Sequence, residues 1–197
     1  MKRKKPISLL MLIFALSLFC SYHIYYYCIN ELNNKKVDKY IEEIVVNNNP
    51  QVIVEKTLET KEDYLGILEI PKLNLKQGFY NIDSKNNDVN KSVMLLKNSV
   101  MPDNVNSTII LAAHSGNSYV GYFKNLDKLN IEDKINIYYQ KNKYQYTVTN
   151  IYELDKNGHI LVDKNIHENI LVLTTCSKNE EKQLVVYAKL LKISDIK

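Results

Sequence analysis

The sequence predicts an all-β domain of about eight strands behind a single N-terminal membrane-spanning helix. Two observations predict this fold. An uncharged apolar run follows a basic N-terminus, and short runs of branched and aromatic residues, divided by turn-type residues, recur from residue 65 onward. The 197 residues allow one domain of roughly 100–150 residues and an appendage. Strands of this number with one or two short helices are typical of a small closed barrel or a sandwich.

The apolar run Ile7–Ile29 contains no charged residue and is long enough for a bilayer-spanning helix of roughly 20 residues. The basic residues Lys2–Lys5 precede it, which predicts a cytoplasmic N-terminus and a domain outside the cell. Tyr22 and Tyr25–Tyr27 stand where an outer aromatic belt is expected. The alternative is a cleaved signal peptide, but a small-residue cleavage site is missing and bulky tyrosines occupy its place. The residues therefore favour a single-pass anchor in the cell membrane.

The net charge of +4 comes from the four basic residues at the N-terminus. Without them the chain has 22 lysines and 22 acidic residues, so the predicted domain is neutral on balance. This balance removes the main electrostatic argument for nucleic-acid binding. The single arginine is Arg3, so the domain also lacks the usual bidentate clamp for carboxylate or phosphate.

Composition divides the chain into three parts. Residues 1–30 form the cytoplasmic tip and membrane anchor, residues 31–63 a polar, lysine-rich stalk, and residues 64–197 the β-domain. Within the stalk, Val37–Val46 is expected to form a short helix that Asn47–Pro50 ends.

The β-domain shows its strands as apolar runs. The predicted strands are Leu65–Ile70, Leu73–Tyr80, Val93–Leu96, Thr108–Ala113, Ile135–Tyr139, Tyr144–Tyr152, Ile170–Thr175 and Leu184–Leu191. A hairpin turn is expected at Lys141–Lys143, and Phe123, Leu126 and Leu129 have the spacing of one face of a short helix over Tyr122–Leu129. Neither a glycine-rich phosphate loop nor a zinc or calcium spacing is present, so we expect no cofactor and no metal.

Two strand ends carry the residues that are suited to chemistry. Cys176 follows the strand before a polar turn, and His114 follows another strand in the same way. A cysteine needs a base or a positive field to form its thiolate, and these two residues could meet if their strands are neighbours. Cys20 and Cys28 belong to the anchor, so Cys176 cannot form a disulfide within the domain. A buried, inert cysteine is the alternative that the residues alone leave open.

Two further histidines, His159 and His167, lie in the polar connection before the cysteine strand, where we expect them to face solvent.

Four segments resemble one known family, in the same order along the chain. They are Gly66–Pro71, Ser99–His114, Tyr122–Leu129 and Leu173–Cys176, within residues 64–191. The last segment matches a T-L-x-T-C signature from its second position, with Val172 in place of the first threonine. Together with the anchor, these segments resemble the sortases, the membrane-anchored cysteine transpeptidases of Gram-positive bacteria.

The resemblance implies a closed, eight-stranded sortase-type β-barrel. Cys176 would attack the Thr–Gly bond of an LPxTG-like sorting signal, and His114 would act as the general acid and base. The partners implied are proteins with such signals and a cell-wall amine, either a peptidoglycan precursor or another acceptor. The stalk lacks an Asp-Pro-aromatic motif, and no apolar segment follows the barrel before Lys197, so we expect attachment to the wall rather than pilin polymerisation.

One position departs from the family pattern. Sortases usually have an arginine at the start of the strand after the cysteine, and that position falls on Gln183. Gln183 could act as a neutral oxyanion or substrate donor, or a slip of one residue could bring Lys182 inward instead. A third alternative is an inactive barrel, which would make the protein a non-catalytic, membrane-tethered module that binds sorting-signal or cell-wall peptides. A hydrolytic cysteine peptidase is a further possibility.

Overall fold

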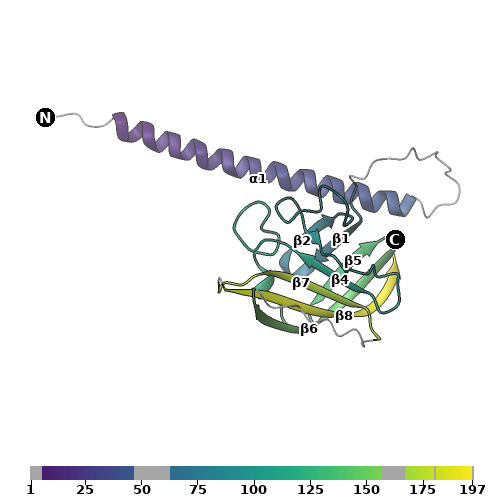
Figure 1. The fold of residues 1–197 in the computed structure, drawn as a ribbon. Coiled ribbons are helices and arrows are strands. Elements are labelled where there is room, and N and C mark those ends of the chain that lie inside the picture. Colours follow the sequence, from purple (N-terminus) through teal and green to yellow (C-terminus); the bar gives the residue numbers. More distant parts are fainter. Residues whose placement is uncertain (1–5, 47–62, 157–166, 180, 197) are drawn as a thin grey trace.

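Eight strands form one sheet that curls into a barrel beside a long N-terminal helix (Figure 1). The structure is a computed structural model that describes residues 6–46, 63–156, 167–179 and 181–196. The strands are β1 (Gly66–Ile70), β2 (Leu75–Phe79), β3 (Met94–Leu95), β4 (Thr108–Ala112), β5 (Lys134–Tyr139), β6 (Asn142–Asp155), β7 (Ile170–Cys176) and β8 (Lys182–Asp195). The helices are α1 (Pro6–Val46) and the short 3-10 helices η1 (Pro71–Leu73) and η2 (Leu126–Lys128). Asn47–Pro50 and His159, on which the sequence makes predictions, lie outside the described residues.

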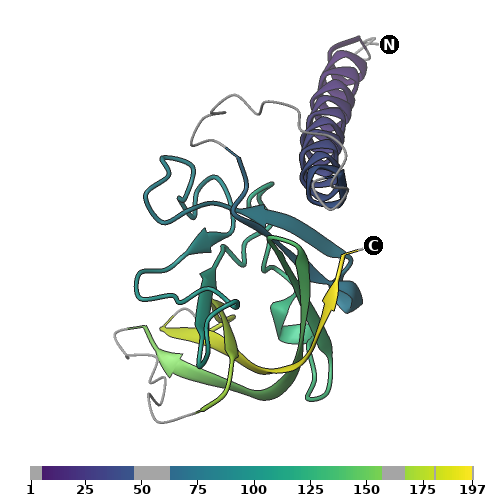
Figure 2. The ribbon, with the colours of Figure 1, turned by 90° about the vertical axis from the view of Figure 1, so that its right-hand side faces the viewer.

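The sheet closes on itself. Its strand order is β2-β1-β5-β6-β8-β7-β4-β3, and a parallel bridge between Phe79 and Val93 joins the end of β2 to the start of β3. The two edges of the sheet therefore meet, and Figure 2 shows the strands as a ring. The predicted eight-stranded barrel is confirmed, and the sandwich alternative is excluded. β6 and β8 are longer than predicted, because they pair with each other along their whole length.

Side chains alternate between the inside and the outside of the barrel, as expected for strands. Leu111, Leu173 and Leu184 belong to the large core inside the barrel. Their neighbours Val172 and Val185 belong to a second, smaller apolar cluster on the outer face. This alternation assigns a face to each residue near the strand ends.

The segment Tyr122–Leu129 forms less helix than predicted. Only Leu126–Lys128 is helical, as the 3-10 helix η2. Phe123, Leu126 and Leu129 are nevertheless all buried in the core, as their common face requires. A spacing of three residues matches the 3.0 residues per turn of a 3-10 helix better than the 3.6 of an α-helix.

The hairpin between β5 and β6 turns earlier than predicted. Tyr139 pairs with Asn142, so the loop consists of Gln140 and Lys141 alone. Gln140 has a φ of 52°, as the first residue of a tight two-residue hairpin often requires. Asn142 and Lys143, predicted as part of the turn, are the first residues of β6.

Helix α1 continues without a break from the apolar run into the segment predicted as a stalk. It contains no proline after Pro6 and no glycine, so nothing in its sequence ends the helix at residue 30. Val37 and Ile44 are buried two turns apart, on the face that contacts the barrel. The expected short helix Val37–Val46 is therefore the last part of α1, and it packs against the barrel beside β2 (Figure 1).

The space around each glycine indicates whether the barrel tolerates an added methyl group there. A Cβ on Gly66 would lie 2.9 Å from the carbonyl oxygen of Tyr138 and 2.6 Å from the Phe79 ring. Because the backbone oxygen cannot move aside, we expect Gly66→Ala to lower the free energy of unfolding by about 1–3 kcal/mol. The measurement is urea denaturation of the full chain in detergent, with unfolding monitored by circular dichroism.

Gly116→Ala is the matched control, because no atom lies within 4 Å of a Cβ at that position. A Gly66→Ala variant as stable as the Gly116→Ala variant would contradict this account of the β1–β5 contact.

Candidate functional site

The ends of β4 and β7 meet at one edge of the barrel because these two strands are parallel neighbours. Their register pairs Ala112 with Thr174, and the Ala113 N–H donates to the Thr174 carbonyl oxygen at 3.4 Å. His114 and Cys176 each lie two residues beyond the pair Ala112 and Thr174. The structure thus brings the two residues singled out in the sequence to the same end of adjacent strands.

A buried hydrogen bond joins the two strand ends directly before these residues. The Thr175 hydroxyl donates to the Ala113 carbonyl oxygen over 2.7 Å. Thr175 and Ala113 are both buried, so water does not compete for this bond. The bond fixes the spacing between the backbone of β4 and that of β7 one residue before His114 and Cys176.

Cys176 is a free, exposed cysteine at the last position of β7. It pairs directly with Gln183 on β8, and directly paired residues present their side chains on the same face of a sheet. The pairs next along the strands, Thr175 with Leu184 and Thr174 with Val185, alternate between the inside and the outside of the barrel. By this alternation Cys176 and Gln183 share the outer face, and Lys182 belongs to the opposite face.

His114 follows the same alternation on β4. Leu111 and Ala113 belong to the inner core, whereas Ile110 packs in the outer cluster, so His114 shares the outer side with Cys176. The His114 carbonyl oxygen accepts a hydrogen bond of 3.0 Å from the Phe123 N–H. Because Phe123 is anchored in the core, this bond ties the backbone of His114 to the barrel interior.

An asparagine that the sequence analysis did not single out contacts the histidine ring. The Nε2 atom of His114 lies 3.1 Å from Oδ1 of Asn90. The Asn90 amide nitrogen donates to Oδ1 of Asp88 at 3.0 Å, which turns the amide oxygen toward His114. The arrangement therefore favours the tautomer whose Nε2–H donates to Asn90. Asp88 and Asn90 lie in the connection before β3, and no sequence pattern marks them.

Asp88 remains charged over the physiological range. The Asn90 backbone N–H, which donates to its carboxylate at 2.9 Å, holds the pKa of Asp88 below its usual value. The carboxylate is therefore available as the acceptor that orients the Asn90 amide.

The turn after Cys176 is closed by several polar contacts. The Ser177 N–H donates to the Lys182 carbonyl oxygen at 3.0 Å, and the Ser177 hydroxyl donates to the Glu153 carboxylate of β6. Lys178 forms an ion pair with Asp127 of η2. These contacts connect the turn to β6 and to the segment that follows His114.

His167, which the sequence analysis also considered, does not lie near His114 and Cys176. His167 is exposed and precedes β7, whose opposite end carries Cys176. Across the described ranges, no group of three or more His, Cys, Asp or Glu side chains could hold a metal ion.

Two adjacent threonines of β7 test the strand-end contact. Thr175→Val removes the hydroxyl that bonds the buried Ala113 carbonyl, so we expect the free energy of unfolding to fall by about 1–2 kcal/mol. The Thr174 hydroxyl is also buried, yet it has no hydrogen-bond partner among the described residues. Thr174→Val should therefore leave the stability unchanged or raise it, in the same denaturation experiment.

Equal losses of stability in the two threonine variants would show that the Thr175–Ala113 bond does not hold the strand ends together.

The comparisons with known proteins agree with this fold. The family model described as the sortase domain matches residues 68–191, which is more than half of the chain. Sortase C of Streptococcus pneumoniae is similar at 19% identity and a TM-score of 0.62, with 82% of this chain and 95% of that chain covered. The Sortase D5 transpeptidase of Clostridium perfringens is 22% identical with a TM-score of 0.61, covering 82% and 99%.

Sortase A of Listeria monocytogenes matches at 21% identity and a TM-score of 0.57, over 67% of this chain and 90% of that chain. The comparison with curated protein sequences finds no match. The likenesses to solved structures establish the fold, and the family model extends over the strands that carry His114 and Cys176. On this match, the chain belongs to the sortase family.

Proposed function

We propose that this protein is a cysteine transpeptidase in which Cys176 is the nucleophile and His114 the general acid and base. The observation that supports the proposal is the parallel register of β4 and β7, by which His114 and Cys176 follow the same end of two adjacent strands. The exposure of Cys176 also supports it, because a nucleophile must reach its substrate.

The reaction is proposed in two steps. The Cys176 thiolate attacks the carbonyl carbon of the Thr–Gly bond of an LPxTG-like sorting signal. The C–N bond breaks, and His114 donates a proton to the leaving amine. An amine of the cell wall then attacks the thioester, the C–S bond breaks, and His114 accepts the proton of the incoming amine. The thioester keeps the acyl group activated until the second amine arrives.

Gln183 is the proposed donor to the oxyanion. Its direct pairing with Cys176 supports this role over Lys182, whose position belongs to the opposite face. A side-chain amide can serve an oxyanion hole, although it lacks the charge of the arginine that the family usually has there. Among the described residues there is no arginine that could take its place.

The proposed location is the cell membrane, with α1 spanning the bilayer once, the N-terminus in the cytoplasm and the barrel outside. α1 is long and apolar enough to cross a membrane. Its large apolar side chains from Leu9 to Tyr27 are mostly exposed to the surroundings rather than packed on the barrel. Apolar exposure of this extent is stable in lipid and costly in water.

Trapping of the acyl intermediate tests the reaction. With a library of LPxTG-like peptides, we expect intact-protein mass spectrometry to detect a thioacyl adduct, which added hydroxylamine converts to the peptide hydroxamate with release of the Cys176 thiol. Cys176→Ala should abolish both, because no other exposed thiol lies in the barrel. Cys28→Ser, in the anchor, is the control that should react like the natural chain.

Peptide binding without any adduct, unchanged in Cys176→Ala, would instead support a non-catalytic peptide-binding module. Release of the hydrolysed peptide, with a free carboxylate, even in the presence of excess amine would support a hydrolytic peptidase.

Single substitutions at the start of β8 test the proposed oxyanion donor. We expect Gln183→Ala to lower kcat on the order of 10²–10³-fold, as for loss of one oxyanion donor. Lys182→Ala is the matched control on the neighbouring position and should stay within a few-fold of the natural chain. The reverse ranking would mean that the register of β8 against β7 is wrong.

A further inference from the structure

Helix α1 and the barrel are held together outside the apolar run. The Asn33 amide donates to the Lys76 carbonyl oxygen of β2 at 3.2 Å, and it accepts from the Tyr64 hydroxyl at 3.0 Å. The Tyr40 hydroxyl donates to the carbonyl oxygen of Leu65 at 2.8 Å. With Val37 buried against the barrel, these bonds fix the height of the barrel along the helix.

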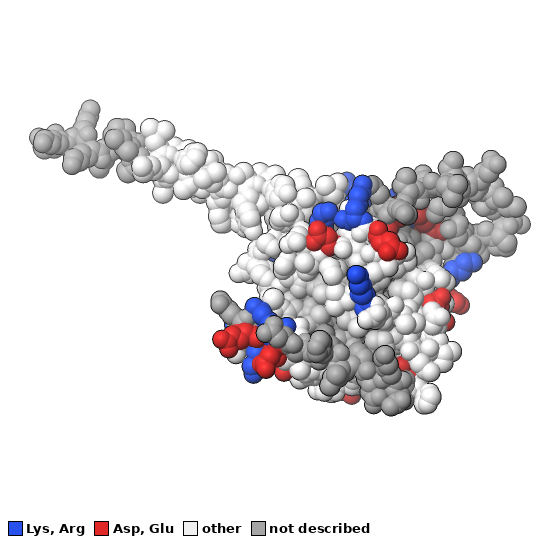
Figure 3. Space-filling model, viewed as in Figure 1, with Lys and Arg blue, Asp and Glu red and all other residues white. Residues whose placement is uncertain are grey.

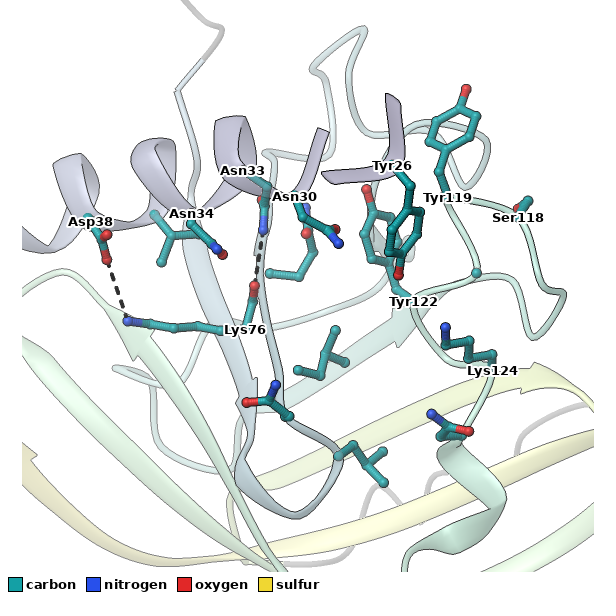
Figure 4. Close-up of a pocket in the computed structure, with 17 residues that line it drawn as sticks. Tyr26, Asn30, Asn33, Asn34, Asp38, Lys76, Ser118, Tyr119, Tyr122 and Lys124 are labelled. Atoms are coloured by element: carbon teal, nitrogen blue, oxygen red, sulfur yellow. Dashed lines mark hydrogen bonds and ion pairs between the residues drawn. The ribbon is translucent and has the colours of Figure 1, made fainter. Parts of the chain in front are cut away.

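The segment after His114 reaches α1 at the level of the tyrosines. The rings of Tyr119 and Tyr25 meet edge to face, with 6.1 Å between centroids. The Lys124 ammonium lies 5.9 Å from the centre of the Tyr26 ring. Figure 4 shows Tyr26, Tyr119 and Lys124 at one end of the cleft between α1 and the barrel.

The character of α1 changes at this same level. Between Leu9 and Tyr27 the described part of the helix carries exposed apolar side chains and no charged residue, and it is white in Figure 3. Toward the C-terminus, Asn30, Asn33 and Asn34 line a cleft of about 650 Å³ together with Lys76 (Figure 4). A span of roughly 20 residues that starts near Pro6 ends at Tyr25–Tyr27, where tyrosines prefer the bilayer interface.

We propose that residues 117–124, between β4 and β5, form a membrane-contact surface that rests in the headgroup layer of the phospholipid bilayer. Tyr119 is 45% exposed and belongs, by its contact with Tyr25, to the same interfacial belt. Lys124 is exposed beside Tyr26, where its apolar stem lies in the interface and its ammonium group meets lipid phosphates. The proposal rests on the membrane insertion of α1 proposed above, but it does not depend on catalysis.

The surface determines which end of the barrel faces the bilayer. The Phe123 N–H, which bonds the His114 carbonyl oxygen, belongs to this segment. In Figure 1 the ends of β7 and β8 that carry Cys176 and Gln183 lie toward the N-terminal side of α1, and the C-terminus lies toward the other end of the helix. The end of the barrel with Cys176 and His114 therefore faces the membrane.

Single-tryptophan variants test the proposal, since the natural chain has no tryptophan. The full chain with Tyr119→Trp is reconstituted into phosphatidylcholine vesicles that contain brominated acyl chains. We expect the bromine atoms to quench at least half of the tryptophan fluorescence. We also expect the emission of this tryptophan to be shifted to shorter wavelength. Ile193→Trp is the matched control: Ile193 is similarly exposed, at 53%, and lies near the C-terminal end of β8. Its fluorescence should be quenched by less than a tenth.

Leu16→Trp, within the apolar run, separates this inference from the proposal on which it rests. Quenching of Leu16→Trp without quenching of Tyr119→Trp would overturn the contact surface while leaving α1 in the membrane. An absence of quenching in both would overturn the membrane insertion itself. A blue-shifted but unquenched Tyr119→Trp would mean that a second copy of the chain, rather than lipid, covers this segment, and would likewise overturn the inference.

Discussion

The parallel pairing of β4 with β7 is the contact on which the rest of the site depends. It is the only parallel ladder between the strands of the described barrel, and it brings two strand ends together where an antiparallel pair would separate them. This pairing determines that Cys176 and His114 lie at the same end of the barrel, and the segment after His114 starts from that end. Residues on the ends of rigid strands are also held more firmly than residues on free loops, which suits the proposed alignment of a thiol with a proton donor.

The residues alone predict an all-β domain, either a small closed barrel or a sandwich, and they mark two candidate site residues, His114 and Cys176. Branched and aromatic runs such as Thr108–Ala113 and Ile170–Thr175 carry a strong strand signal, because each strand is buried on at least one face. The positions of His114 and Cys176 directly after such runs indicate strand ends without any knowledge of the fold. Neither apolar run indicates which strand it pairs with, and only the resemblance to a family suggested that these two strands are neighbours.

Other parts of the site could not be predicted because they depend on register or on short polar contacts. The side of the sheet on which Gln183 lies follows from its pairing with Cys176, and a slip of one residue would have exchanged it with Lys182. Asn90 is an ordinary loop residue in the sequence, and it matters only because the barrel brings it to the His114 ring. The continuity of α1 was hidden by the change from apolar to polar residues, which alters the surroundings of a helix but does not end it.

The parallel ladder also has a consequence for folding. Parallel neighbours cannot be joined by a tight turn, and here β5 and β6 intervene in the chain between β4 and β7. β7 must enter between β4 and β8, so contacts that are distant in sequence close late and slow the folding of such a topology. No fragment that ends before β7 contains both His114 and Cys176. His114 and Cys176 thus come to the same end of the barrel only once β7 has paired with β4, and a partly folded chain has His114 without Cys176 beside it.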